Sequence, residues 1–151
     1  MDIKLDNLRH PDVISLVMEH LRCMADTSPP ESRHALDLNK LRDASITFWT
    51  CWHHSTLAGC IALKEVSPSH GELKSMKTAN TCLRMGVGRK LLEHLITESK
   101  KRGYTQLSLE TGSMSYFEPA RALYTRFGFK VCSPFAHYHE DPNSVYMNLE
   151  L

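Results

Sequence analysis

Hydrophobic residues recur along the chain with two different periods, and the change from one period to the other predicts where helices and strands lie. Spacings of three and four residues are typical of a helix that buries one face, whereas alternation or a short apolar run is typical of a strand. The predicted order is a strand, two helices, three strands, a helix, a strand, a helix and two strands. A length of 151 residues and an ordinary globular composition allow one domain covering residues 1–151.

The first half of the chain should hold two helices and four strands. The first helix is expected to start at Pro11 and to end at Ser28-Pro29-Pro30, because neither proline can donate a helical N–H. Its buried face should carry Val13, Val17, Met18, Leu21 and Met24. A second helix should carry Ala35, Leu38 and Leu41, and strands are expected at residues 3–8, 45–52, 57–66 and 72–78.

The second half should hold two further helices and three strands. The first of these helices should turn Val87, Leu91, Leu92, Leu95 and Ile96 inward and end at Gly103. A strand is expected at residues 105–111. The next helix should carry an apolar stripe of Tyr116, Phe117, Ala120, Leu123, Tyr124 and Phe127, with a capping box formed by Ser115 and Glu118 at its start. A hairpin that includes residues 133–143 should close the chain.

A glycine pair lies where the third long strand is expected to lead into a helix, in the segment Met85-Gly86-Val87-Gly88-Arg89-Lys90. Two glycines on alternate residues permit a tight turn and leave the backbone N–H groups unscreened. A helix N-terminus adds unpaired N–H groups and a positive dipole end, so this loop favours an anion such as a phosphate. A plain strand-to-helix turn is the alternative that the loop alone leaves open.

A second segment, Ala120-Arg121-Ala122-Leu123-Tyr124-Thr125-Arg126-Phe127-Gly128-Phe129, follows about forty residues later. Together the two segments resemble the GNAT superfamily of N-acetyltransferases. The first is similar to the family's R/Q-x-x-G-x-G/A pyrophosphate loop, and the second to its A-x-x-x-Y-x-x-x-G-F element. Two positions depart from the family: Leu83 replaces the usual Arg or Gln, with the basic residue displaced to Arg84, and Phe117 replaces a common Asn.

This resemblance implies a single α+β domain with a mixed, mostly antiparallel sheet, and acetyl-coenzyme A as the co-substrate. It places the pantetheine arm along the backbone of Met76, Lys77 and Thr78, like an added strand. The pyrophosphate would be surrounded by the residues Arg84, Met85, Gly86, Val87, Gly88, Arg89 and Lys90.

Acetyl transfer to an amine needs a base for the amine proton and an acid for the leaving thiolate. No covalent intermediate is needed when both substrates are held together. The resemblance favours Glu72 as the base, directly or through water, and a solvated carboxylate at a strand edge is the alternative. Tyr124 occupies the family's tyrosine position and should be the acid, because its phenol is neutral at working pH. Its alternative is one more aromatic residue in an apolar stripe.

The acceptor is expected to be a primary amine of a small molecule, and residues 26–37 and 133–143 should shape its pocket. A peptide or protein amine is the less favoured acceptor, and a regulatory module that binds acyl-coenzyme A without catalysis is a rival function. Glu110 and Thr111 are candidates for the pocket wall, although they could instead cap the following helix. Tyr138 lies in the last hairpin, where such enzymes often shape the acceptor pocket.

Composition excludes several other classes. A net charge of +1 gives no basic stripe for nucleic acid, no apolar run has membrane-spanning length, and no G-x-x-x-x-G-K-[S/T] motif indicates a nucleotide triphosphate site. The five cysteines lack metal-ligand spacing, and the pairs His53-His54 and His137 with His139 are read as loop residues, so no metal is expected. The N-terminus lacks a signal-peptide core, which favours the cytoplasm. The oligomeric state stays open, with a homodimer as one alternative.

Overall fold

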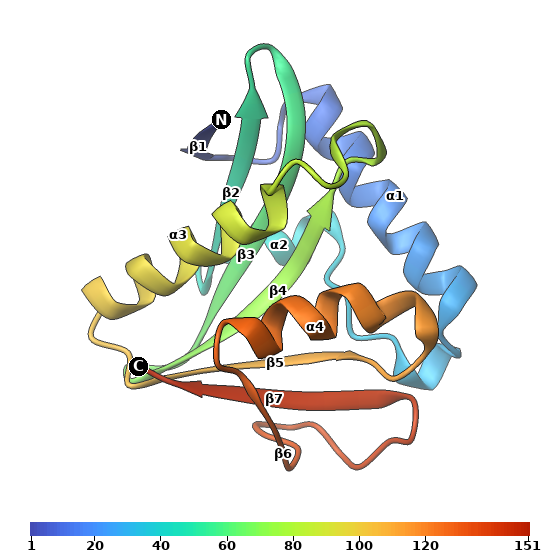
Figure 1. Ribbon diagram of the computed structural model, residues 1–151, viewed down its shortest axis with the longest axis vertical. Coiled ribbons are helices and arrows are strands. Elements are labelled where there is room, and N and C mark those ends of the chain that lie inside the picture. The colour runs from blue at the N-terminus through green and yellow to red at the C-terminus, as the bar shows by residue number, and fades with distance from the viewer.

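The computed structural model describes all residues from Met1 to Leu151 and is built on one seven-stranded sheet in the order β1-β2-β3-β4-β5-β7-β6 (Figure 1). Every neighbouring pair is antiparallel except β4 with β5, so the predicted mixed, mostly antiparallel sheet is confirmed. The strands are β1 (Asp2–Leu5), β2 (Ile46–His53), β3 (Thr56–Ser67), β4 (His70–Thr78), β5 (Gln106–Gly112), β6 (Lys130–Cys132) and β7 (Ser144–Glu150).

Four α-helices and three 3-10 turns complete the domain, and the predicted order of helices and strands is confirmed. The helices are α1 (Pro11–Thr27), α2 (Leu38–Leu41), α3 (Val87–Lys101) and α4 (Glu118–Arg126), and the turns are η1 (Pro30–Ser32), η2 (Asn80–Cys82) and η3 (Ser115–Phe117).

Three local predictions are wrong. β1 ends at Leu5 rather than at residue 8, because the Asp6 carboxylate accepts the Leu8 N–H at 2.7 Å and Leu8 adopts a φ of 62°. The second helix spans only Leu38–Leu41, with Asp37 as its N-cap, so Ala35 precedes it. The capping box does not form, because Phe117 is the N-cap of α4 and no side chain caps that end.

Two hydrophobic cores lie on opposite faces of the sheet, as strand alternation requires. Trp49 and Ile61 belong to the core under α3 and α4, whereas Phe48 and Ala62 belong to the core under α1 and α2. The predicted buried face of α1 needs one correction: Met18 is 51% exposed, and the buried stripe is formed by Val13, Leu16 and Val17.

β4 and β5 separate soon after they meet, and this divergence creates the site (Figure 1). Their parallel pairing covers only His70–Glu72 against Gln106–Ser108. Beyond Glu72, the edge of β4 that faces β5 has no strand partner. A bulge in β4 opposite β3 places Ser75 at a φ of 53° and re-aims the backbone of the following residues.

Candidate active site

A cavity of about 450 Å³ fills the split between β4 and β5. Its walls come from both strands, from α1 and the segment after it, and from η3 and α4. Glu110 and Thr111 of β5 and Tyr124 of α4 line it, as do Met76, Lys77 and Thr78 of β4. The fold therefore brings together the predicted acid, two predicted acceptor residues and the predicted pantetheine strand.

A second cavity, of about 640 Å³, lies at the N-terminus of α3. It shares five lining residues with the first cavity: Thr78, Leu83, Gly88, Pro119 and Leu123. The two spaces are thus neighbours along one path that runs from the β4–β5 split to the glycine loop. An elongated ligand with a phosphate group at one end would fit such a path.

The glycine loop has the backbone geometry of an anion site. Gly86 is the N-cap of α3 with a φ of 80°, and a Cβ added there would meet nothing within 4 Å. The first intrahelical bond that follows runs from the Lys90 N–H to the Gly86 carbonyl. The N–H groups of Val87, Gly88 and Arg89 precede it at the helix N-terminus, where N–H groups lack intrahelical partners and favour an anion.

The structure brings most of the predicted phosphate residues together, but not all of them. Arg84, Gly86, Val87, Gly88 and Arg89 line the second cavity. Met85 does not line it, and the Lys90 ammonium instead donates to the carbonyl of Met1. The contact with Met1 therefore holds the Lys90 ammonium outside the second cavity.

Part of the wall of the second cavity was not predicted from the sequence. Pro119, Leu123, Arg126 and Phe127 of the α4 region also face the second cavity. Arg126 adds a cation opposite the glycine loop. Its place depends on how α4 packs beside α3, and no local pattern marks it.

Tyr124 is buried, and its ring packs into the larger core. It lines the first cavity, and none of the side-chain hydrogen bonds of the structure involves its hydroxyl. Burial raises the pKa of Tyr124 above its ordinary value of 10, and the Glu110 carboxylate adds to the rise. The phenol is therefore protonated across the neutral range, as an acid that donates one proton must be.

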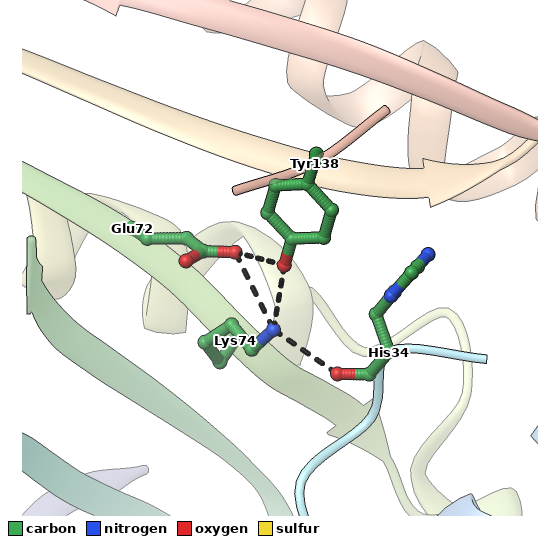
Figure 2. A network of polar contacts seen from close by, with 4 residues as sticks. All are labelled: His34, Glu72, Lys74 and Tyr138. Carbon is green, nitrogen blue, oxygen red and sulfur yellow. Dashed lines mark hydrogen bonds and ion pairs between the residues drawn. The ribbon is translucent and has the colours of Figure 1, made fainter. Parts of the chain in front are cut away.

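Glu72 is fully buried rather than solvated at a strand edge, and it does not line the first cavity. Its carboxylate accepts a hydrogen bond of 2.5 Å from the Tyr138 hydroxyl and lies 3.4 Å from the Lys74 ammonium (Figure 2). Lys74 also donates to the Tyr138 hydroxyl at 2.9 Å and to the His34 carbonyl at 3.1 Å. The ammonium thus uses its three donors on three protein oxygens.

This buried network ties the two segments predicted to shape the acceptor pocket to β4. Lys74 holds His34 of the first segment and Tyr138 of the second (Figure 2). The segments also bond to each other, because the Ser32 hydroxyl donates to the Asp141 carboxylate at 2.5 Å. Tyr138, predicted to contact the substrate, does not line the cavity and instead supports its wall.

Glu110 is the only Asp or Glu residue that lines the first cavity. Burial raises its pKa from 4.5 to about 7, and the Glu72 and Asp141 carboxylates add to the rise. The Lys74 ammonium lowers it, as does the Ser144 hydroxyl, which lies nearby without completing a hydrogen bond. A carboxyl with this pKa exchanges a proton near neutral pH.

The histidines noted in the sequence lie apart from the cavity. His53 ends β2 and His54 follows it in the turn, with ring centroids 4.5 Å apart. His137 stacks on the Tyr138 ring. No group of three or more His, Cys, Asp or Glu side chains is placed to hold a metal ion. None of the helices is both long and apolar enough to cross a membrane.

Comparison with known proteins places this geometry in a family. The model of the acetyltransferase (GNAT) family matches residues 14–129. YsnE of Bacillus subtilis (strain 168), an uncharacterized N-acetyltransferase, is 58% identical over 151 residues, which cover 100% of both chains. YedL of Escherichia coli (strain K12), also an uncharacterized N-acetyltransferase, is 47% identical over 149 residues, which cover 99% of this chain and 94% of YedL.

The fold agrees with that of solved structures. The PaiA N-acetyltransferase from Thermoplasma acidophilum, solved in complex with coenzyme A, superposes with a TM-score of 0.75 at 21% identity and covers 100% of both chains. The chain therefore belongs to the GNAT family and is an N-acetyltransferase. The resemblance seen in the glycine loop and in the Tyr124 segment is confirmed.

Proposed function

We propose that the protein transfers an acetyl group from acetyl-coenzyme A to a primary amine of a small molecule, by direct attack while both substrates are bound. The observation that carries this proposal is the pair of neighbouring cavities. One lies at the glycine loop and suits a pyrophosphate, and the other holds Glu110 and Tyr124 in the β4–β5 split.

The residues present fit acetyl-coenzyme A. Gly86 leaves open space above the loop, and Arg84, Arg89 and Arg126 line the same cavity as cations for the phosphates. Beyond Glu72, β4 offers backbone N–H and C=O groups on an edge that lacks a strand partner, which suits an extended pantetheine arm. When bound, this co-substrate supplies the activated acetyl group.

The chain would then hold and move protons around the reacting atoms. Backbone N–H groups on the free edge of β4 would polarise the thioester carbonyl as negative charge develops there. The amine nitrogen forms a bond to the acetyl carbon, and the bond from that carbon to sulfur breaks with its electron pair on sulfur. The Tyr124 hydroxyl would protonate that sulfur.

Removal of the amine proton is the role that the sequence favours for Glu72. In this structure, the Glu72 carboxylate is buried and bonded to Tyr138, which does not line the cavity either, and to Lys74, which does. Glu72 could therefore take a proton from the amine only through a relay such as water. A role for Glu72 as the base would depend on such a relay.

A panel of amines with acetyl-coenzyme A tests the function. Release of free thiol should depend on a small primary amine, and mass spectrometry should find that amine heavier by one acetyl group. Release with peptides alone would assign a peptide or protein acceptor instead. Thiol release that does not depend on any amine or peptide would contradict amine transfer. Gly88→Val is the control variant, because its coenzyme site should be damaged.

Two further proposals concern the location and the oligomeric state of the enzyme. The five cysteines are all free thiols, which supports a cytoplasmic location where thiols stay reduced. A homodimer stays a prediction, and light scattering on the purified protein would test it.

A further inference from the structure

The β4–β5 split joins the two faces of the sheet, and the candidate groups divide between these faces. Leu107 and Leu109 of β5 belong to the core under α3 and α4, together with Tyr124. Glu110 follows Leu109, so strand alternation puts its side chain on the opposite face. That face also carries Glu72 and Lys74, which are linked to the segments at His34 and Tyr138.

We infer that Glu110 is the general base that takes the proton from the acceptor amine, and that Glu72 is a positioning residue. The inference rests on the proposed function. Glu110 and Tyr124 line one cavity, whereas Glu72 does not line it, and its Oε2 atom is bonded to Tyr138 and paired with Lys74. The acceptor reaches Glu110 on one face of the sheet, and the donor sulfur reaches Tyr124 on the other.

The charges around Glu110 suit this role. The Glu110 carboxyl interacts electrostatically with groups on four elements. They are Glu72 and Lys74 on β4, Tyr124 on α4, Tyr138 and Asp141 in the loop before β7, and Ser144 and Tyr146 on β7. Glu72 and Lys74 form an ion pair with each other. Glu110 is thus the carboxylate left to pair with an ammonium group in the cavity.

The proton balance of the reaction follows from these positions. An acceptor that enters as an ammonium ion gives one proton to Glu110, and its nitrogen then bonds to the acetyl carbon. Tyr124 gives its proton to the sulfur as the bond between carbon and sulfur breaks. The nitrogen loses a second proton, which replaces the one that Tyr124 gave away. One proton leaves to solvent from Glu110, and the products are the acetamide and the free thiol.

The proposal makes different predictions for the two carboxylates. Glu110→Gln should lower kcat/KM by roughly a hundred- to ten-thousand-fold and remove the acidic limb of its pH profile, and Glu110→Asp should restore part of the rate with the limb. Glu72→Gln should keep the limb but move it to lower pH, because the Glu72 charge helps to raise the pKa of Glu110. Glu118→Gln, at an exposed carboxylate of α4, is the matched control and should match the wild type.

A measurement without substrate tests the proposal for Glu110 independently of the proposed acetyl transfer. In protein labelled with 13C at glutamate carboxyls, one resonance absent from Glu110→Gln should titrate near pH 7. It should move to lower pH in Glu72→Gln. If Glu72→Gln does not fold, the double variant Glu72→Gln/Lys74→Gln removes both charges of the buried pair and should leave the Glu110 titration close to that of the wild type.

The outcomes are distinct. An acidic limb that survives in Glu110→Gln with a near-normal rate overturns the inference while acetyl transfer stands. Loss of the limb in both single variants also overturns it, because the proton would then pass through both carboxylates. A wild-type enzyme that acetylates no amine refutes the proposed function, whereas the carboxyl titration still reports the state of Glu110. Coenzyme affinity by calorimetry should be unchanged in every variant.

Discussion

The Tyr138 hydroxyl donates a hydrogen bond of 2.5 Å to the Glu72 carboxylate, although 66 positions separate the two residues. The same hydroxyl accepts a hydrogen bond from Lys74. One buried oxygen therefore holds the loop before β7 against β4, beside the first cavity. A hydroxyl that bonds two charged groups in the interior stabilises more than an exposed one would.

Tyr138→Phe removes this oxygen and keeps the ring. The unfolding free energy should fall by about 1–3 kcal/mol, because two buried charged groups each lose a partner. Amide hydrogen exchange in residues 133–143 should speed up. Urea unfolding and exchange mass spectrometry measure the two effects. Tyr116→Phe, at a residue 48% exposed, is the matched control, and an equal change in both variants would contradict the role of the network.

Tyr124→Phe tests the proposed acid in the same way. The ring packs in the core, so stability and coenzyme affinity should stay close to those of the wild type. Loss of the donor should lower kcat by roughly ten- to a thousand-fold. Single-turnover rates are needed as well, because slow product release would mask the loss. Unchanged single-turnover rates with intact binding would make Tyr124 a core residue only.

A larger residue at Gly88 tests whether the glycine loop binds the phosphates of the coenzyme. It would fill space at the loop and would not strain the backbone. Gly88 is helical, and the left-handed residue of the loop is Gly86. A Cβ at Gly88 would lie 3.2 Å from a methyl carbon of Leu123 and would reduce the gap between the loop and α4. Gly88→Val should weaken coenzyme binding by roughly tenfold or more and Gly88→Ala by less, in calorimetric titration. Equal affinity in all three folded proteins would remove this loop from the coenzyme site.

Gly112 and Phe117 form a second tight contact, at the end of β5. A Cβ on Gly112 would lie 2.1 Å from the Phe117 ring, so only glycine admits the ring in this place. Gly112→Ala should lower the unfolding free energy by about 1–3 kcal/mol, because the ring must move. Adding Phe117→Leu should recover part of that loss, as a double-mutant cycle would measure. A cycle without coupling would show that the two residues relax independently.

The parts of the site that the sequence predicts are those set by local spacing. The glycine loop follows from residues 85–90, and the burial of the Tyr124 ring follows from the apolar helical stripe that carries it. The place of Tyr124 at the site was implied by the resemblance to the GNAT family and not by spacing. The link from Glu72 to Tyr138 was not predictable, because it joins a strand to a distant loop and no periodicity constrains that pairing. The start of the second helix was misplaced for a related reason. The His34 carbonyl accepts a hydrogen bond from the distant Lys74, and the helix begins only after Asp37, whose side chain caps it.

The pH dependence of the unfolding free energy offers a last test, because burial shifts the pKa values of two groups at the cavity in opposite directions. Glu110 has a folded-state pKa of about 7, above its ordinary 4.5, so the folded protein binds this proton more tightly than the unfolded chain. Its contribution to stability is full at low pH and is lost as pH rises toward 7. His20, also on the cavity wall, has a pKa lowered by burial and by the Lys77 charge to about 4 from 6.5, so its contribution is lost as pH falls.

Each shift corresponds to about 3 kcal/mol by linkage, and between pH 4.5 and 6.5 the two changes oppose each other. Glu110→Gln should therefore gain stability relative to the wild type as pH rises from 4.5 to 7, and His20→Gln should gain relative stability as pH falls from 6.5 to 4. Urea unfolding at several pH values measures both differences, and packing changes drop out because they do not depend on pH. A difference that stays constant with pH for Glu110→Gln would show that the carboxyl has an ordinary pKa, and it would remove the electrostatic support for Glu110 as the base.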